Sequence, residues 1–192
     1  MKFAGLIISL GMFAIFMVGC GGDAPQTTEE KQLSTLPDWY INVPQDPNYL
    51  FAAATATSKD MQLAVDKAKQ QARLDVASQL DVRIKGLTKK FDEEVGLNED
   101  TELLASFTQA SKSVVSTTLQ GSQVDKQEIM TEGSLFRAYV LMQLPWGDAR
   151  AEMLQKIKDS QNLYTRFRAS QAFQELDKEV EEYENWKKEQ GL

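Results

Sequence analysis

Side chains that commonly carry out chemistry are scarce in this 192-residue sequence, which has one cysteine and no histidine. Histidine is the usual general base near neutral pH and the commonest ligand of transition metals. Its absence excludes Ser-His-Asp and Cys-His catalysis. A single thiol excludes an internal disulfide and a cysteine-based zinc site. We therefore expect a protein that is not an enzyme and that has no catalytic residues, cofactor or metal site.

The single thiol belongs to Cys20, at the end of an apolar run. The chain starts with Met-Lys, residues 3–18 are almost wholly apolar, and the run closes with MVGC at residues 17–20. A charged start, an apolar stretch and a small residue are typical of a secretory signal peptide. The last four residues resemble the bacterial lipobox, whose cysteine receives a diacylglycerol before the signal is cut and the new N-terminus is acylated. We predict a signal peptide over residues 1–19 and a lipid on Cys20.

Two other interpretations of this N-terminus stay open. An uncleaved transmembrane anchor is one, although a run of roughly 16 apolar residues is shorter than the ~20 that span a bilayer. An ordinary signal peptide followed by a chance cysteine is the other. Stable attachment through Cys20 agrees with the physics, since each buried CH₂ adds roughly 0.8 kcal/mol and several acyl chains hold better than one.

The residues after Cys20 bear on the destination of such a protein. An aspartate directly after the lipidated cysteine commonly retains lipoproteins of this type in the inner membrane, and here that position is Gly21. The resemblance therefore implies delivery to the outer membrane, on its periplasmic side or at the cell surface. Residues 20–36 are polar and have no hydrophobic period, which predicts a flexible tether with a reach of roughly 20 Å.

Charge and composition narrow the partners. The net charge of −7 and the lack of a Lys/Arg stripe argue against nucleic acid. Apolar residues make up 42% of the chain, enough to bury a core. Two acidic groups, at residues 92–94 and 98–100, do not match the spacing of an EF-hand. Helix capping and solvation explain them better than a calcium site.

Order is predicted to begin at residues 37–41, PDWYI. The aromatic pair Trp39-Tyr40 either binds a ligand or packs across the domain as a clasp, and we favour packing. Pro44 and Pro47 keep the next residues extended. Residues 49–56, YLFAAATA, predict a strand that is inner or covered by a helix, because both of its faces are apolar.

A long amphipathic helix is predicted next, capped by Ser58 or Asp60 and ended by Gly96. Gly86 could bend it, and residues 82–84 favour a competing strand because two of them are β-branched. The apolar residues of its single buried face recur at steps of nearly four: Ala64, Ala68, Ala72, Val76, Leu80, Ile84, Leu87, Phe91 and Val95.

The second half of the chain predicts a helix, a hairpin and a final helix. Residues 98–100 supply the cap of the second helix, which Gly121 ends. The hairpin joins residues 122–130 to 135–144 through a turn at Glu132-Gly133. After PWGD at 145–148, one helix is predicted from about Asp148 to Glu189.

That last helix would be about 60 Å long if continuous. Its second part carries a coiled-coil-like seam that either packs on the domain or binds a partner or a second copy. Trp146, at its start, is expected to be structural, as is Trp39. The seam residues are spaced 4-3-4-3: Ala169, Phe173, Leu176, Val180 and Tyr183.

Three stretches together resemble the LPP20 family of bacterial lipoproteins. They are PDWYINVP at 37–44, YLFAAATATSKDMQLAVDKAKQQARLDVASQLDVRIKGL at 49–87, and YVLMQLP at 139–145. The shared features are a Pro-x-Trp start, a small-residue strand and an alanine-rich helix. The resemblance implies a small α/β domain and a surface or outer-membrane lipoprotein that is not an enzyme. Some relatives belong to flagellar structures such as outer-membrane-associated disks, and Cys20 is the only site residue that the family transfers.

We therefore predict an α+β fold with a small antiparallel or mixed sheet of about three strands packed on long helices, and an extended C-terminal helix. The domain covers residues 37–146 and the helix residues 147–192. The leading hypothesis is a non-catalytic envelope lipoprotein with a structural or scaffolding role, for which a flagellar or other outer-membrane-associated assembly is the candidate setting. Its expected partners are the membrane, through the lipid, and a second copy or another envelope protein. The alternative is a periplasmic lipoprotein that binds a small ligand or peptide.

Overall fold

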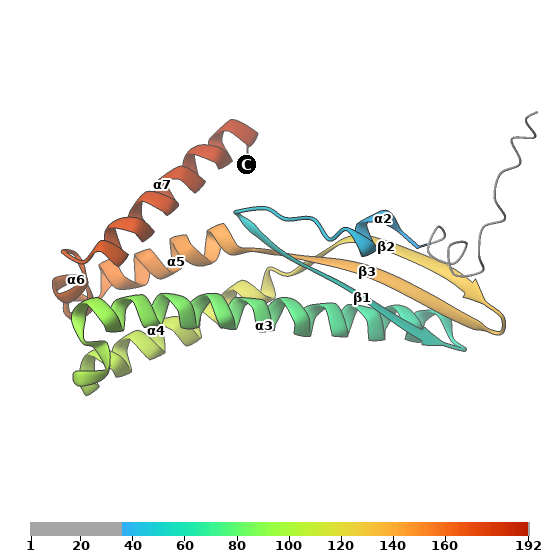
Figure 1. Ribbon diagram of the computed structural model, residues 1–192, viewed down its shortest axis with the longest axis horizontal. Helices are drawn as coiled ribbons and strands as arrows, with labels where there is room; N and C mark the ends of the chain where they lie inside the picture. The colour runs from blue at the N-terminus through green and yellow to red at the C-terminus, as the bar shows by residue number, and fades with distance from the viewer. Residues whose placement is uncertain (1–35, 192) are drawn as a thin grey trace, which may run out of the picture. The chain divides into compact units, whose positions relative to one another are not determined.

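The computed structural model describes residues 36–191. Figure 1 shows the arrangement of the helices and strands. In chain order they are α2 (Asp38–Ile41), β1 (Tyr49–Ser58), α3 (Met61–Val95), the 3₁₀ turn η1 (Leu97–Glu99), α4 (Thr101–Gln120), β2 (Gln123–Glu132), β3 (Leu135–Pro145), α5 (Trp146–Asp159), α6 (Gln161–Phe167) and α7 (Gln171–Gln190).

The three strands form one antiparallel sheet in the order β1-β3-β2, so β3 is the central strand. α3 lies across one face of the sheet (Figure 1). Alternate residues of β3 point toward α3, as the period-2 pattern predicts. The residues of that face are Phe136, Ala138, Val140, Met142 and Leu144, and all but the half-buried Phe136 are buried. β1 is an edge strand covered by a helix, which is one of its two predicted alternatives.

α3 begins and ends where the sequence predicted. The Asp60 side chain accepts a hydrogen bond from the Leu63 N–H at 2.7 Å, which satisfies one of the free donors of the first turn. Gly96 ends the helix in the left-handed conformation, with φ 66°. Gly86 does not interrupt it, and residues 82–84 are helical, so the competing strand is wrong.

α4 and the hairpin also follow the sequence. Asp100 caps α4 by accepting from the backbone N–H groups of Glu102 and Leu103. The turn of the hairpin is Gly133-Ser134, one residue later than predicted. Gly133 has a φ of 61°, which the first central position of a type II′ turn requires. The bulge between Val124 and Lys126 twists the outer strand β2, whose residues are almost all exposed.

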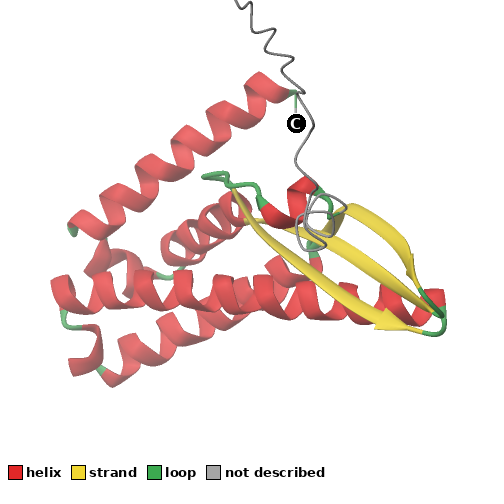
Figure 2. Ribbon diagram, turned by 45° about the vertical axis from the view of Figure 1, so that its right-hand side comes forward, coloured by secondary structure: helices red, strands yellow, loops and turns green. Residues whose placement is uncertain are grey.

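The single helix predicted from Asp148 to Glu189 is wrong. The chain breaks at Ser160 and again at residues 168–170, giving α5, α6 and α7 (Figure 2). Each break is an N-cap, because the Ser160 hydroxyl accepts from the Leu163 N–H and the Ser170 hydroxyl from the Phe173 N–H. α7 then folds back across α5.

The fold-back gives the predicted seam an internal partner. Phe173, Leu176, Val180 and Tyr183 are buried against α5 and α3, whereas Ala169 is exposed. The seam therefore gives no support to self-association. At the start of α5, a Cβ on Gly147 would lie 2.3 Å from the Tyr183 ring, so only glycine lets α7 approach this closely.

Tyr183 also donates a hydrogen bond to the Asp148 carboxylate, with 2.8 Å between the oxygens. Burial, and next the bond and charge of Asp148, raise the pKa of the Tyr183 hydroxyl well above its ordinary value of 10. Lys187 reaches the same carboxylate at 3.2 Å. These contacts tie the end of α7 to the start of α5.

Residues 38–41 pack on the face of the sheet opposite α3. Residues 38–41 form one helical turn, and residues 42–48, here called the N-terminal arm, contain no helix or strand. Tyr40 packs edge-on against Tyr139 with ring centroids 4.9 Å apart, and Trp39 donates to Glu128 at 2.9 Å. The aromatic pair is thus the predicted clasp. The fold class predicted from the sequence, α+β with a three-stranded antiparallel sheet, long helices and a C-terminal helix, is confirmed.

Candidate functional site

Cys20, the one residue to which the sequence assigns a chemical role, lies outside the described residues. Two of the acidic side chains that could have suggested a calcium site, Asp92 and Asp100, instead accept hydrogen bonds from backbone N–H groups. Asp92 accepts from the backbone N–H of Asn98 at 2.7 Å and from its side-chain amide at 2.6 Å, and Asp100 caps α4. Within residues 36–191, no three acidic or cysteine side chains cluster as metal ligands.

A hollow surface lies along the outer face of α3, where the helix leaves the edge of the sheet. Two adjoining hollows of about 560 and 450 Å³ share Asp46, Pro47, Leu50 and Arg83 in their walls. We call them together the Gly86 groove. α3 forms one wall, and the residues that it contributes follow its helical repeat: Gln79, Val82, Arg83, Gly86, Leu87 and Lys90.

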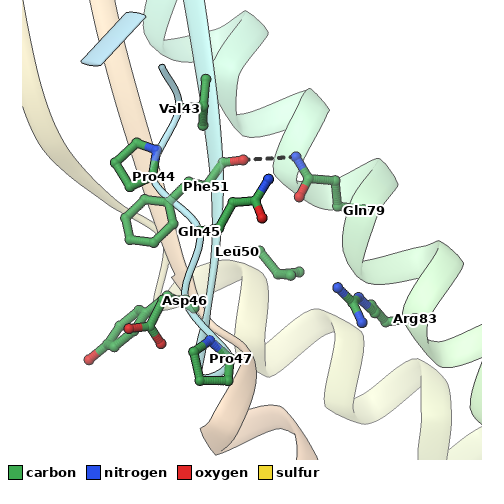
Figure 3. A pocket seen from close by; sticks show the side chains of 10 residues that line it. Val43, Pro44, Gln45, Asp46, Pro47, Leu50, Phe51, Gln79 and Arg83 are labelled. Atoms are coloured by element: carbon green, nitrogen blue, oxygen red, sulfur yellow. Dashed lines mark hydrogen bonds between the residues drawn. The ribbon is translucent and has the colours of Figure 1, made fainter. Parts of the chain in front are cut away.

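The upper part of the groove lies between α3, the N-terminal arm and β1 (Figure 3). Gln79 extends from α3 and donates to the Phe51 carbonyl at 2.9 Å, so a side chain satisfies this carbonyl of the edge strand. Arg83 extends from the next turn toward the strand (Figure 3). Within residues 36–191, no backbone hydrogen bond joins β1 to anything but β3.

Arg150 of α5 forms the base of the lower part. Its guanidinium donates to Glu179 of α7 at 3.0 Å and to the side-chain carbonyl of Asn48 at 3.0 Å. It also reaches the Pro47 carbonyl at 3.4 Å and lies over the Trp146 ring, 5.8 Å from its centroid. Only 10% of the side chain is exposed, so Arg150 holds the arm, α5 and α7 together around a buried positive charge. Its Nε–H finds no acceptor within the described residues.

Two further cations flank Arg150 in the groove. Lys90 pairs with Glu175 of α7 at 3.0 Å, and this bond raises the pKa of the lysine above its ordinary value of 10.5. The Arg83 side chain makes no hydrogen bond or ion pair with any residue from 36 to 191. Against these three cations the lower hollow has two carboxylates, Asp46 and Glu179. Since Glu175 pairs with Lys90 and Glu179 pairs with Arg150, Arg83 is the cation of the groove that lacks an ion-pair partner within residues 36–191.

Gly86 forms the floor of the lower hollow. A Cβ placed on it would meet no atom within 4 Å, so the glycine is not needed to fit any side chain of this domain. Next to it, Val82 is 66% exposed, the largest exposed fraction among the large hydrophobic residues of residues 36–191. Sequence patterning marked Gly86 only as a possible bend, and gave no sign of Arg83 or Arg150.

A second hollow of about 470 Å³ lies between α3 and α4 and is lined by Ile84, Phe107, Val115 and Leu119 among others. The buried Ser111 hydroxyl in its wall has no partner within the described residues. Only one charged residue from each helix, Asp81 and Lys112, lines it. The hollow thus has one charge of each sign and no arginine in its lining.

A protein-family model described as LPP20 lipoprotein matches residues 37–144, more than half of the chain. The chain belongs to the LPP20 lipoprotein family. Comparisons with curated proteins and with solved structures gave no match. Among residues 36–191 of this LPP20 lipoprotein, no helix combines the length and the apolar character needed to cross a membrane.

The family match covers the clasp, the sheet, α3 and α4, and stops one residue before the end of β3. Arg83, Gly86 and Lys90 lie inside the matched part of this LPP20 lipoprotein, whereas Arg150 and Glu179 lie beyond it. The Gly86 groove therefore combines the family domain with the helices that follow it.

Proposed function

We propose that this chain is a non-catalytic lipoprotein of the outer membrane, held there by a lipid on Cys20, whose domain has a structural role in an envelope assembly. The observation that carries the proposal is the order of the segments along the sequence. A lipobox at 17–20 and a polar stretch of about sixteen residues precede the LPP20 match, which begins at residue 37. Such an arrangement suits a folded domain that stands clear of a lipid surface and binds its partner there.

Further support comes from the catalytic residue types that the sequence lacks or contains only once. Without histidine and with its one thiol in the lipobox, the chain would have only carboxylate, lysine, tyrosine or hydroxyl chemistry to use. The Tyr183 hydroxyl, whose pKa burial raises, is bonded to Asp148 and packed on Gly147. A flagellar or other large outer-membrane-associated structure is the assembly that the family resemblance favours.

The test is affinity isolation of the full-length, C-terminally tagged protein from detergent-solubilised envelopes, next to a Cys20→Ser variant. In membrane fractionation, we expect the wild type to sediment with outer membranes. In the affinity isolation, we expect an envelope protein or a second copy of the chain to be purified together with it. The variant should leave the outer-membrane fraction. A strictly monomeric wild type without co-isolated protein, together with unchanged envelope structures and motility after deletion, would contradict the proposal.

A ligand-binding lipoprotein is the second candidate, and the Gly86 groove favours it. Its two hollows fall within the range of roughly 300–1,000 Å³ that is common for ligand sites. A thermal-shift screen of the full-length protein with small carboxylates and peptides tests this candidate. A stabilising compound whose effect disappears in Gly86→Leu would support it, and a screen without such a compound would count against it.

A further inference from the structure

α3 buries one face and leaves the opposite side exposed, and part of that exposed side borders a groove. Its residues Val82, Arg83 and Gly86 line the groove between the N-terminal arm and α7. Glycine weakens the interior of a helix because it loses the most conformational freedom on folding. Since no atom lies within 4 Å of a Cβ at Gly86, packing inside the domain gives no reason for a glycine there.

A close approach from outside the domain gives that reason. A bare helix backbone lets another main chain come nearer than any side chain would allow. The exposed Val82 beside the glycine offers apolar contact to whatever approaches. The lower hollow is thus shaped for an occupant that lies across Gly86.

Charge selects the kind of occupant. Of the three cations in this groove, Lys90 is paired with Glu175 and Arg150 with Glu179. Arg83 has no acidic partner within residues 36–191, and its side chain extends toward the strand (Figure 3). A carboxylate is the group that such a guanidinium recognises, often through two parallel hydrogen bonds.

The shape of the groove favours an extended chain over a compact molecule. The two hollows adjoin across Pro47 and Arg83, and the upper one follows the free edge of β1. A segment that lies along this edge finds backbone groups that β3 does not use, while its acidic side chains reach Arg83. Gln79, which now caps the Phe51 carbonyl, marks where the edge already accepts a hydrogen bond from outside the sheet.

We propose that the Gly86 groove binds an extended, carboxylate-bearing segment of another envelope protein. The inference rests on the proposed function, because it takes the domain to act by binding a protein partner, and it names the surface and the chemistry of that partner. A second copy of this chain, a small carboxylate and a lipid surface are the occupants that the experiment separates from it.

The experiment uses the full-length lipidated protein in nanodiscs of phosphatidylcholine, which carries no net charge. The probe is a fluorescein-labelled octapeptide of alternating alanine and glutamate, and binding is followed by fluorescence anisotropy. The control probe replaces every glutamate by glutamine. We expect the glutamate peptide to bind and the glutamine peptide to bind at least about tenfold more weakly, as the loss of charge-assisted bonds implies.

Three variants locate the binding. A Cβ at Gly86 meets no atom within 4 Å, so Gly86→Leu should project into the groove and weaken binding at least about tenfold while the melting temperature does not fall. Arg83→Gln should weaken binding by about tenfold through the lost carboxylate contact. Lys89→Gln is the matched control, because Lys89 is exposed, pairs with Glu93 and lies outside the groove. It should bind as the wild type does.

Four results would overturn the proposal. The wild type could fail to bind the glutamate peptide at millimolar concentration, or Gly86→Leu could bind it as well as the wild type does. Lys89→Gln could lose as much binding as Arg83→Gln, or free glutarate could bind as tightly as the peptide.

Affinity isolation from envelopes separates this proposal from the proposed function. A partner captured equally well by wild type and Gly86→Leu would leave the scaffold role standing and reject the groove as its site. If that partner is a second copy, the groove proposal also fails. A wild-type protein that carries no lipid on Cys20, or that is isolated without any partner, would instead reject the proposed function itself.

Discussion

Along its first turns α3 faces the sheet with alanines, whereas along its last turns it faces other helices with branched and aromatic residues. Ala64, Ala68 and Ala72 are fully buried under β1 and β3. Farther along, Phe91 stacks on Phe167 of α6 with ring centroids 4.3 Å apart. We call these the sheet half and the helical half of α3.

The difference shows how one helical stripe can serve two kinds of layer. Small side chains let the helix approach the sheet closely, and large ones fill the wider space between helices. Phe107 of α4 completes an aromatic cluster in the helical half, 5.5 Å from Phe91 and 5.6 Å from Phe167. The Gly86 groove lies on the outer side of α3 in the helical half, and its upper hollow extends back to the edge of the sheet.

The largest expected effect comes from emptying the helical half. Phe91→Ala removes the ring shared by α3, α4 and α6, and should lower the free energy of unfolding by about 3–5 kcal/mol. Urea unfolding followed by circular dichroism measures it. Val82→Ala, on the exposed side of the same helix, should change the free energy by less than about 0.5 kcal/mol. A loss below about 1 kcal/mol for Phe91→Ala would mean that the aromatic cluster does not hold this half together.

Overfilling the sheet half is expected to have the next largest effect. Ala68→Leu forces a large side chain between α3 and the sheet, and should lower the free energy of unfolding by about 1–3 kcal/mol. Ser78→Leu places the same side chain on the exposed face of α3 and serves as the control. If both variants were equally stable, close packing of helix on sheet would not be the reason for the alanines.

Two capping aspartates allow the halves to be compared, because Asp60 caps α3 in the sheet half and Asp100 caps α4, which packs against the helical half. Asp60→Ala and Asp100→Ala each remove an N-cap, at the start of α3 and of α4, and each should lower the free energy of unfolding by about 1 kcal/mol. Hydrogen exchange should rise at Leu63 in the first variant and at Leu103 in the second. Faster exchange at both sites in either variant would show that the halves do not open separately.

Gly86→Ala should raise the free energy of unfolding by about 0.5–1 kcal/mol, since alanine favours the helix and meets no atom there. The urea midpoint measures the gain. A destabilised variant would show that the glycine is needed by the fold, and would remove the reason for assigning it to an occupant.

The smallest effect is the pH dependence of the ion pair between α3 and α7. The hydrogen bond to Lys90 holds the pKa of the Glu175 carboxyl below its ordinary value of 4.5, and that bond also raises the pKa of Lys90 above 10.5. The stabilisation from Glu175 is therefore present above pH 4.5 and is lost as the pH falls through the lowered pKa. The part from Lys90 is present below pH 10.5 and is lost as the pH rises through the raised pKa.

Lys90→Gln should thus lower the urea midpoint slightly at pH 7, and the difference from the wild type should shrink near pH 3. Lys89→Gln, whose partner Glu93 lies on the same helix, is the control. A difference for Lys90→Gln that stays constant from pH 7 to pH 3 would contradict a role for its charge.

Much of the fold follows from local signals in the sequence. The steps of four between Ala64 and Phe91 predicted α3, and Asp60, Gly96, Asp100 and Gly121 marked helix ends. The breaks after α5 and α6 were missed because the apolar spacing continues across them and no glycine or proline stands there. Ser160 and Ser170 were the available signals, since serine favours the N-cap.

The groove was beyond the reach of the sequence for a different reason. Asn48, Arg83 and Arg150 come from the arm, α3 and α5, and they meet only because α5 starts where β3 leaves the sheet beside the arm. Such long-range proximity depends on tertiary packing and leaves no periodic pattern in the chain. Only Gly86, a glycine inside a predicted helix, carried a local hint.

The central claim, a domain of the LPP20 family held at the outer membrane through Cys20, is tested most directly by the intact mass of the protein purified from outer membranes. A chain that begins at Cys20 and carries the mass of a diacylglycerol and an N-terminal acyl group is the predicted result. The Cys20→Ser variant should be absent from the outer membrane. An unmodified chain, or one that keeps residues 1–19, would contradict the claim.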